Sequence, residues 1–131
     1  MMTNRLQKEK EKKMALISDY DKSQGVNSFI LNGQPVWLDK ATRVGLANSL
    51  AIEKSAGRES TTLWLGGYSY IMSIDLALNM LYALELYAKD CYNVTERHKA
   101  NILSEQDFNR VYNYDYTKGY PKRLSFDCVA E

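Results

Sequence analysis

Residues 61–72 read TTLWLGGYSYIM, and this stretch decides the fold. Two runs rich in β-branched and aromatic residues flank the pair Gly66-Gly67. Glycine accepts the positive φ angles that a two-residue hairpin turn requires, so the pattern predicts a β-hairpin. Because an isolated hairpin is marginally stable in water, other elements are expected to cover one of its faces.

The covering element follows directly along the chain. From about Ile74 or Asp75 the sequence runs past Lys99 without Gly or Pro, which predicts one long helix. Small and apolar side chains recur in it at alternating spacings of four and three residues: Ala77, Leu81, Leu84, Ala88, Cys91 and Thr95. This spacing places them on one face of an amphipathic helix.

A second hairpin is predicted upstream, with Asn32-Gly33 as its turn between two β-rich runs at residues 28–31 and 34–38. Pro35 has no amide proton, so its strand is expected at a sheet edge. Trp37, in the same strand, is expected to anchor the core.

A helix over residues 40–56 is predicted to follow. Asp39 is a suitable N-cap for it, and Gly57 stands where a glycine should end it. Gly45 inside this helix costs about 1 kcal/mol relative to Ala, which indicates close packing at that point.

Together these elements predict an α+β domain over residues 21–131, in which two hairpins form a small antiparallel sheet packed against two to three helices. Ser104 is expected to cap a short helix that runs through roughly Val111. Gly119 is expected at positive φ, and the Tyr120–Pro121 bond is a candidate for the cis form.

Residues 1–20 form a charged arm in front of this domain, composed of good helix formers. Its first 13 residues hold five basic and two acidic side chains, a net +3, so the rest of the chain carries −2. Such a polar helix gains little from burial. Two interpretations remain open: a solvated arm, or a connector that packs on a neighbouring subunit.

The bulk composition excludes several classes of protein. A net charge of +1 argues against a general nucleic-acid binder. No apolar run approaches the roughly 20 residues of a membrane span. Cys91 and Cys128 are too few for a disulfide scaffold, so reduced thiols are expected, although a bridge between them is conceivable.

The sequence holds no recognisable catalytic or metal-binding set, so no enzyme, cofactor or metal is expected. His98 is the single histidine. Cys91 lies two helical turns away, about 10 Å along the axis, which is too far for direct proton transfer. A lone histidine on a helix is more often a packed or exposed residue than a catalyst.

Tyrosine is the conspicuous residue type, with ten in the chain. Tyrosine supplies contact area with a polar tip at protein interfaces, although half-buried positions at the core edge are its more common use. The aromatic residues predicted to form an interaction surface are Trp64, Tyr68, Tyr70, Tyr114, Tyr116 and Tyr120. Lys118, Lys122 and Arg123 lie among the last of these, but Asp115 and Asp127 dilute their charge, which argues against base stacking on nucleic acid.

Several motifs resemble those of a domain-of-unknown-function family found in phage and prophage proteins of gut bacteria. They are VNSF (26–29), LNG (31–33), WLD (37–39) with Arg43, CYNVT (91–95) with His98, and the closing YDYTKGYP (114–121). The likeness spans roughly residues 18–126. Members of the family often follow a helical stretch at the end of larger phage proteins, and their layout loosely resembles tail-fibre-assembly domains; here the domain stands behind a short charged arm.

The resemblance implies no activity, but it implies a context. The expected function is that of a phage virion structural or assembly protein, associated with the tail, fibre or baseplate and made in the bacterial host cytoplasm. It would bind other virion proteins through the N-terminal arm, form a homo-oligomer, and contact neither nucleic acid nor membrane. The alternatives are a tail-fibre assembly factor that is absent from the virion, and a receptor- or glycan-binding module.

Overall fold

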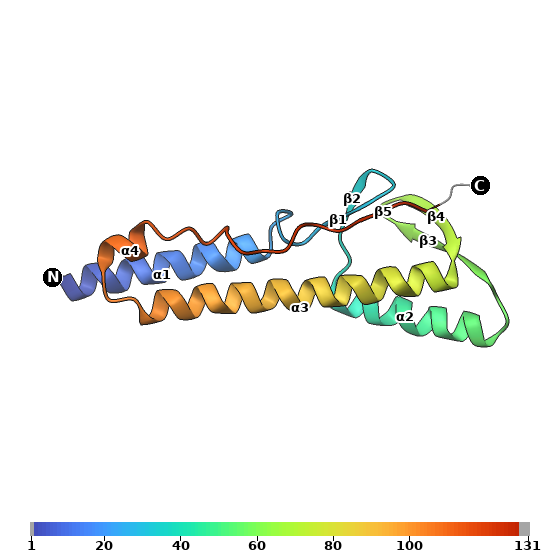
Figure 1. Ribbon diagram of the computed structural model, residues 1–131, viewed down its shortest axis with the longest axis horizontal. Helices are drawn as coiled ribbons and strands as arrows, with labels where there is room; N and C mark the ends of the chain where they lie inside the picture. Colours follow the sequence, from blue (N-terminus) through green and yellow to red (C-terminus); the bar gives the residue numbers. More distant parts are fainter. Residues whose placement is uncertain (1, 129–131) are drawn as a thin grey trace. The chain divides into compact units, whose positions relative to one another are not determined.

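The computed structural model describes residues 2–128, with side chains from residue 4 onward. Its order of elements confirms the α+β prediction (Figure 1). The elements are α1 (Met2–Asp21), β1 (Phe29–Leu31), β2 (Gln34–Val36), α2 (Lys40–Ser55), β3 (Ser60–Leu65), β4 (Tyr68–Ser73), α3 (Ile74–Ser104), α4 (Phe108–Tyr112) and β5 (Ser125–Phe126).

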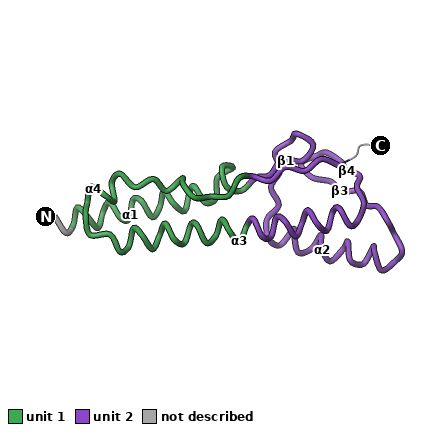
Figure 2. The backbone as a smooth tube through the Cα atoms, in the orientation of Figure 1, with its two compact units in different colours: residues 1–27, 88–122 green, residues 28–87, 123–131 purple. Residues whose placement is uncertain are grey.

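The described chain divides into two compact units (Figure 2). Unit 1 combines residues 2–27 with 88–122, and unit 2 combines residues 28–87 with 123–128. This is not a division between an arm and a domain at residue 20. Instead, α1 belongs to a unit that also contains α4 and the second part of α3, because Ile17 is fully buried there with Ile102 and Val111.

Both hairpins form in unit 2 with the expected turns. Asn32 and Gly33 have φ angles of 50° and 79°, and Gly66 and Gly67 have φ angles of 59° and 85°. The strand that contains Pro35 lies at a sheet edge, as its missing amide proton requires.

The two hairpins do not share one sheet, in contrast to the sequence prediction. β3 and β4 form a two-stranded sheet, whereas the first hairpin gains β5 in the order β2-β1-β5. β5 runs parallel to β1. Asn32 fixes this added strand, since its backbone amide donates to the carbonyl of Phe126 and its side-chain carbonyl accepts from the amide of Cys128.

Helix α2 begins and ends as predicted. The carboxylate of Asp39 accepts a 2.7 Å hydrogen bond from the amide of Thr42, and this bond lowers the pKa of Asp39. Gly57 takes a φ of 88° beyond the C-terminus. The expectation of close packing at Gly45 is wrong, because a Cβ atom there would meet no atom within 4 Å apart from its chain neighbours and the backbone of its own helix.

Gly45→Ala is therefore expected to stabilise the protein by about 0.5–1 kcal/mol, because the exposed helix interior gains an alanine without a steric conflict. Urea unfolding of both proteins, followed by circular dichroism at 222 nm, measures the change. A loss of stability would mean that the surroundings of Gly45 are tighter than described.

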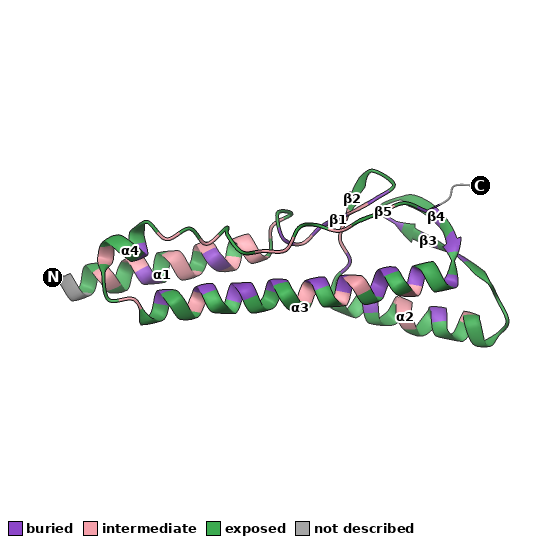
Figure 3. Cartoon of the chain, in the orientation of Figure 1, coloured by how far each residue is buried: buried purple, intermediate pink, exposed green. Residues whose placement is uncertain are grey.

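Helix α3 buries the face that its sequence spacing predicts, and Figure 3 shows buried positions recurring along it. Ala77, Leu81, Leu84, Cys91 and Thr95 are all buried. The predicted Ser104 cap is wrong. Ser104 is the last residue of α3, where its hydroxyl donates to the carbonyl of Asn101, and Asp107 caps α4 instead.

The remaining local expectations have mixed outcomes. Gly119 takes a φ of 92°, as expected, whereas Tyr120–Pro121 is trans like every described peptide bond. Trp37 is partly buried against the core of unit 2, with the Arg43 guanidinium 5.2 Å from its ring centre. Both cysteines are buried thiols.

Candidate protein-binding surfaces

The β3–β4 hairpin has one buried face and one exposed face. Burial alternates along β3, so Thr61, Leu63 and Leu65 point into the core of unit 2. The intervening side chains of both strands point outward and are exposed: Ser60, Thr62, Trp64, Ser69, Ile71 and Ser73. We call these six residues the outer ribbon face.

Trp64 dominates the outer ribbon face. It is 73% exposed, and Ile71 on the neighbouring strand is 43% exposed. An exposed tryptophan is the side-chain type most enriched among residues that dominate binding energy at protein interfaces. The outer ribbon face is also uncharged, because residues 60–73 include no Asp, Glu, Lys or Arg.

The two tyrosines of this hairpin lie differently from Trp64. Tyr68 is 58% exposed, but it pairs with Leu65 and so belongs to the opposite face, at the turn end. The prediction of an interaction role for Tyr70 is wrong, because it pairs with Leu63 and is 4% exposed in the core. Directly opposed residues of antiparallel strands share a face, which buries Tyr70 with Leu63.

A second surface feature of unit 2 is a groove of about 150 Å³ between α2 and α3. Its lining residues are Arg43, Val44, Ala47, Asn48, Leu81, Tyr82 and Glu85. Val44 and Tyr82 are 49% and 57% exposed.

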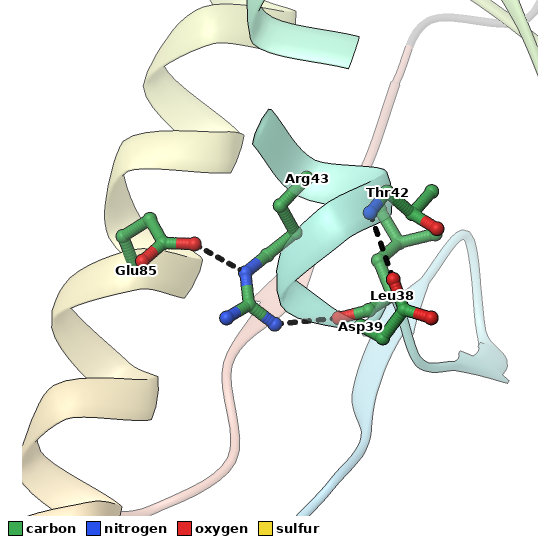
Figure 4. A network of polar contacts seen from close by, with 5 residues as sticks. All are labelled: Leu38, Asp39, Thr42, Arg43 and Glu85. Atoms are coloured by element: carbon green, nitrogen blue, oxygen red, sulfur yellow. Dashed lines mark hydrogen bonds and ion pairs between the residues drawn. The ribbon is translucent and has the colours of Figure 1, made fainter. Parts of the chain in front are cut away.

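Arg43 links α2 to α3, the two helices that line this groove (Figure 4). Its Nε donates to a carboxylate oxygen of Glu85 at 2.6 Å, and one terminal nitrogen donates to the carbonyl of Leu38 at 2.5 Å. The Arg43 side chain is 5% exposed, so the charge is buried and depends on these partners. The geometry assigns Arg43 a structural role.

The closing aromatic segment of unit 1 is held by His98. The carbonyl of Lys118 can only accept, so Nε2 of His98 carries the proton and donates to it at 2.7 Å. Nδ1 then accepts from the hydroxyl of Tyr114 at 2.6 Å, and that hydroxyl accepts from the side-chain amide of Asn101. Both ring nitrogens of His98 are thus occupied within the chain.

A chain of hydrogen bonds in unit 1 fixes the side chain of Tyr120. The Thr95 hydroxyl donates to the Asp21 carboxylate at 2.8 Å, so Tyr120 donates its own proton to Thr95 at 2.6 Å. Burial raises the pKa of Tyr120, and the negative charge of Asp21 adds to this shift. The Tyr20 ring packs edge-on against Tyr120 and Tyr116.

Tyr114, Tyr116 and Tyr120 are therefore half-buried side chains with partners inside unit 1. The structure gives them the role of attaching residues 113–122 to α1 and α3. Between them, Asp115 accepts from the side chain and the amide of Thr117, and these bonds lower the pKa of Asp115. Of the six predicted interaction residues, only Trp64 and Tyr68 are mostly exposed.

Helix α1 packs against the rest of unit 1 at several positions along its length. Lys10 is 8% exposed, and its ammonium donates to the carbonyl of Leu103 at 2.9 Å, near the C-terminus of α3. A cation at this end of a helix is favourable, since it satisfies a carbonyl that lacks a partner in the helix. Lys8 and Lys12 point outward and are exposed.

Among residues 2–128, no three His, Cys, Asp or Glu side chains gather closely enough to hold a metal ion. None of the helices in that range has the length and apolarity needed to cross a bilayer. No family model matches the chain, and no curated protein and no solved structure matches it.

Proposed function

We propose that this protein is a structural or assembly component of a phage virion, associated with the tail, fibre or baseplate, and that it works by binding other proteins. The observation that carries the binding role is Trp64, 73% exposed on an uncharged face. The phage context rests on the resemblance of residues 18–126, above all the closing YDYTKGYP, to the phage-associated family.

In this proposal α1 contributes a surface for other virion proteins and is not a free tether. Its inner side is held by Ile17 and Lys10. Its outer side presents exposed Lys8 and Lys12 at a spacing of four residues, so that both lie on one helical face. Acidic surfaces of a neighbouring protein fit such a face.

Mass spectrometry of purified particles tests the proposal. We expect the chain to be present in a copy number that is a multiple of three, six or twelve. Its absence from particles, together with co-purification with a fibre protein from infected cells, would identify an assembly factor. Absence from both would overturn the proposal.

Trp64 also favours a second candidate, a receptor- or glycan-binding module, since an exposed aromatic ring can stack on a sugar. A glycan array probed with the parent protein and with Trp64→Ala tests this candidate. Signals that vanish with the substitution support glycan binding, and a blank array for the parent protein excludes it for the glycans displayed.

A further inference from the structure

We propose that the outer ribbon face binds the same face of a second copy of this chain, as a two-fold symmetric contact in which Trp64 of each copy packs on Ser69 of the other. The inference rests on the proposed function only in taking protein binding as the role of this surface. It goes further by naming the partner and the arrangement.

The shape of the face favours this contact. Two of its three cross-strand pairs, the middle one and the one nearest the turn, combine one large apolar side chain with one small side chain: Ile71 with Thr62, and Trp64 with Ser69. The large residues lie on opposite strands. The face therefore has two protrusions and two low positions, arranged diagonally.

This pattern is self-complementary. A rotation of 180° about an axis parallel to the strands, between two stacked ribbons, exchanges β3 with β4. Trp64 of one copy then lies over Ser69 of the other, and Ile71 lies over Thr62. Each protrusion meets a low position, as side chains must to interdigitate between packed sheets about 10 Å apart.

The lack of charge on the face also favours this contact. Residues 60–73 carry no charged side chain, so this face meets its own copy without like-charge repulsion. A charged partner would bury its charges against a surface that offers no counter-ion, at a substantial cost. Two-fold contacts require one surface to be complementary to itself, and a neutral face of mixed large and small residues meets that requirement.

The small size of the face predicts a weak contact. Six residues make a small contact, well below the roughly 1,200 Å² of total buried area at which standard interfaces begin. We therefore expect a weak, concentration-dependent dimer in dilute solution. Copies held close together in an assembly would associate more completely, because the local concentration is higher.

Sedimentation velocity of the full chain over a roughly hundredfold range of concentration tests the proposal, since dimer formation follows mass action. The parent is expected to shift toward dimer as concentration rises. Trp64→Glu is expected to weaken association at least tenfold. The matched control is Ile52→Lys on α2, 69% exposed in the same unit, which is expected to dimerise like the parent.

A mixing experiment tests the two-fold arrangement itself. Ser69→Lys and Trp64→Glu are each expected to impair self-association. Mixed together, they are expected to form a heterodimer, because position 64 of one copy faces position 69 of the other. One contact of that heterodimer is the native Trp64–Ser69 pair, and the second becomes an ion pair that weakens at high salt.

A parent protein that stays monomeric throughout would overturn the proposal, as would a Trp64→Glu protein that dimerises like the parent. Circular dichroism checks the fold of each variant. If Trp64→Glu does not fold, Thr62→Lys, at another exposed position, takes its place with the same expected loss. These results are independent of particle composition, so a failed dimer and a failed virion assignment are distinguishable.

Discussion

Glu85→Ala is expected to lower the free energy of unfolding by about 3 kcal/mol, one of the largest effects of any single change outside the apolar core. This loss is expected because the partner, Arg43, is buried, whereas Glu85 itself is not. The Glu85 side chain is 42% exposed, whereas that of Arg43 is 5% exposed. Removal of the carboxylate leaves a buried guanidinium with the Leu38 carbonyl and the Trp37 ring as its remaining partners.

Urea unfolding of four proteins isolates this effect: the parent, Glu85→Ala, Arg43→Met and the double variant. Arg43→Met removes the charge and retains much of the apolar volume, so it is expected to cost less than Glu85→Ala. In the double variant the cost of Glu85→Ala should largely disappear, because no buried charge remains to be compensated.

The control is Lys54→Ala, which removes a 3.0 Å ion pair with Asp75 in the same unit. Those side chains are 60% and 75% exposed, so a loss of no more than about 1 kcal/mol is expected. Equal losses for Lys54→Ala and Glu85→Ala would contradict the role assigned to Arg43.

His98→Leu is expected to destabilise unit 1 by about 2 kcal/mol and to release the segment from residue 113 to 122. Leucine fills a similar volume but forms no hydrogen bond, so the Lys118 carbonyl loses its donor and the Tyr114 hydroxyl loses its acceptor. Hydrogen exchange read by mass spectrometry should show faster exchange in that segment, with the amides of β3 and β4 unchanged.

Two further variants make the His98 experiment specific. His98→Gln keeps a side-chain N–H that can reach the Lys118 carbonyl, so a smaller increase in exchange is expected. Leu103→Ala changes a 59% exposed residue of the same helix and should leave the segment protected. If His98→Leu exchanges like the parent, the aromatic packing of Tyr116 and Tyr120 holds the segment without His98.

Features encoded locally were predictable from the sequence. The Asn32-Gly33 and Gly66-Gly67 turns, the Asp39 cap and the buried face of α3 each depend on neighbouring residues and a fixed period. The short helix was predicted to begin too early, because Ser104 and Asp107 are both acceptable caps. The choice depends on where α3 ends, which local chemistry does not fix.

Features that depend on distant residues were not predictable. The pairing of β1 with β5 joins positions nearly a hundred residues apart, and nothing in either strand specifies it. The same holds for the tyrosines of the closing segment, whose partners come from α1 and α3. For Tyr70 a usable signal did exist, since a two-residue turn at Gly66-Gly67 places it opposite Leu63, on the inward face.

The burial of Ile17 with Ile102 and Val111 bears on how the chain is made. Ile102 and Val111 follow Ile17 by 85 and 94 residues, so at roughly 5–20 residues per second Ile17 is synthesised about 4–19 seconds before they are. β1 likewise waits for β5, near the end of the described chain. Unit 1 therefore cannot close until Val111 has been made, and unit 2 cannot close until β5 has been made. During that interval α1 is a polar helix whose few apolar residues expose little surface to aggregation.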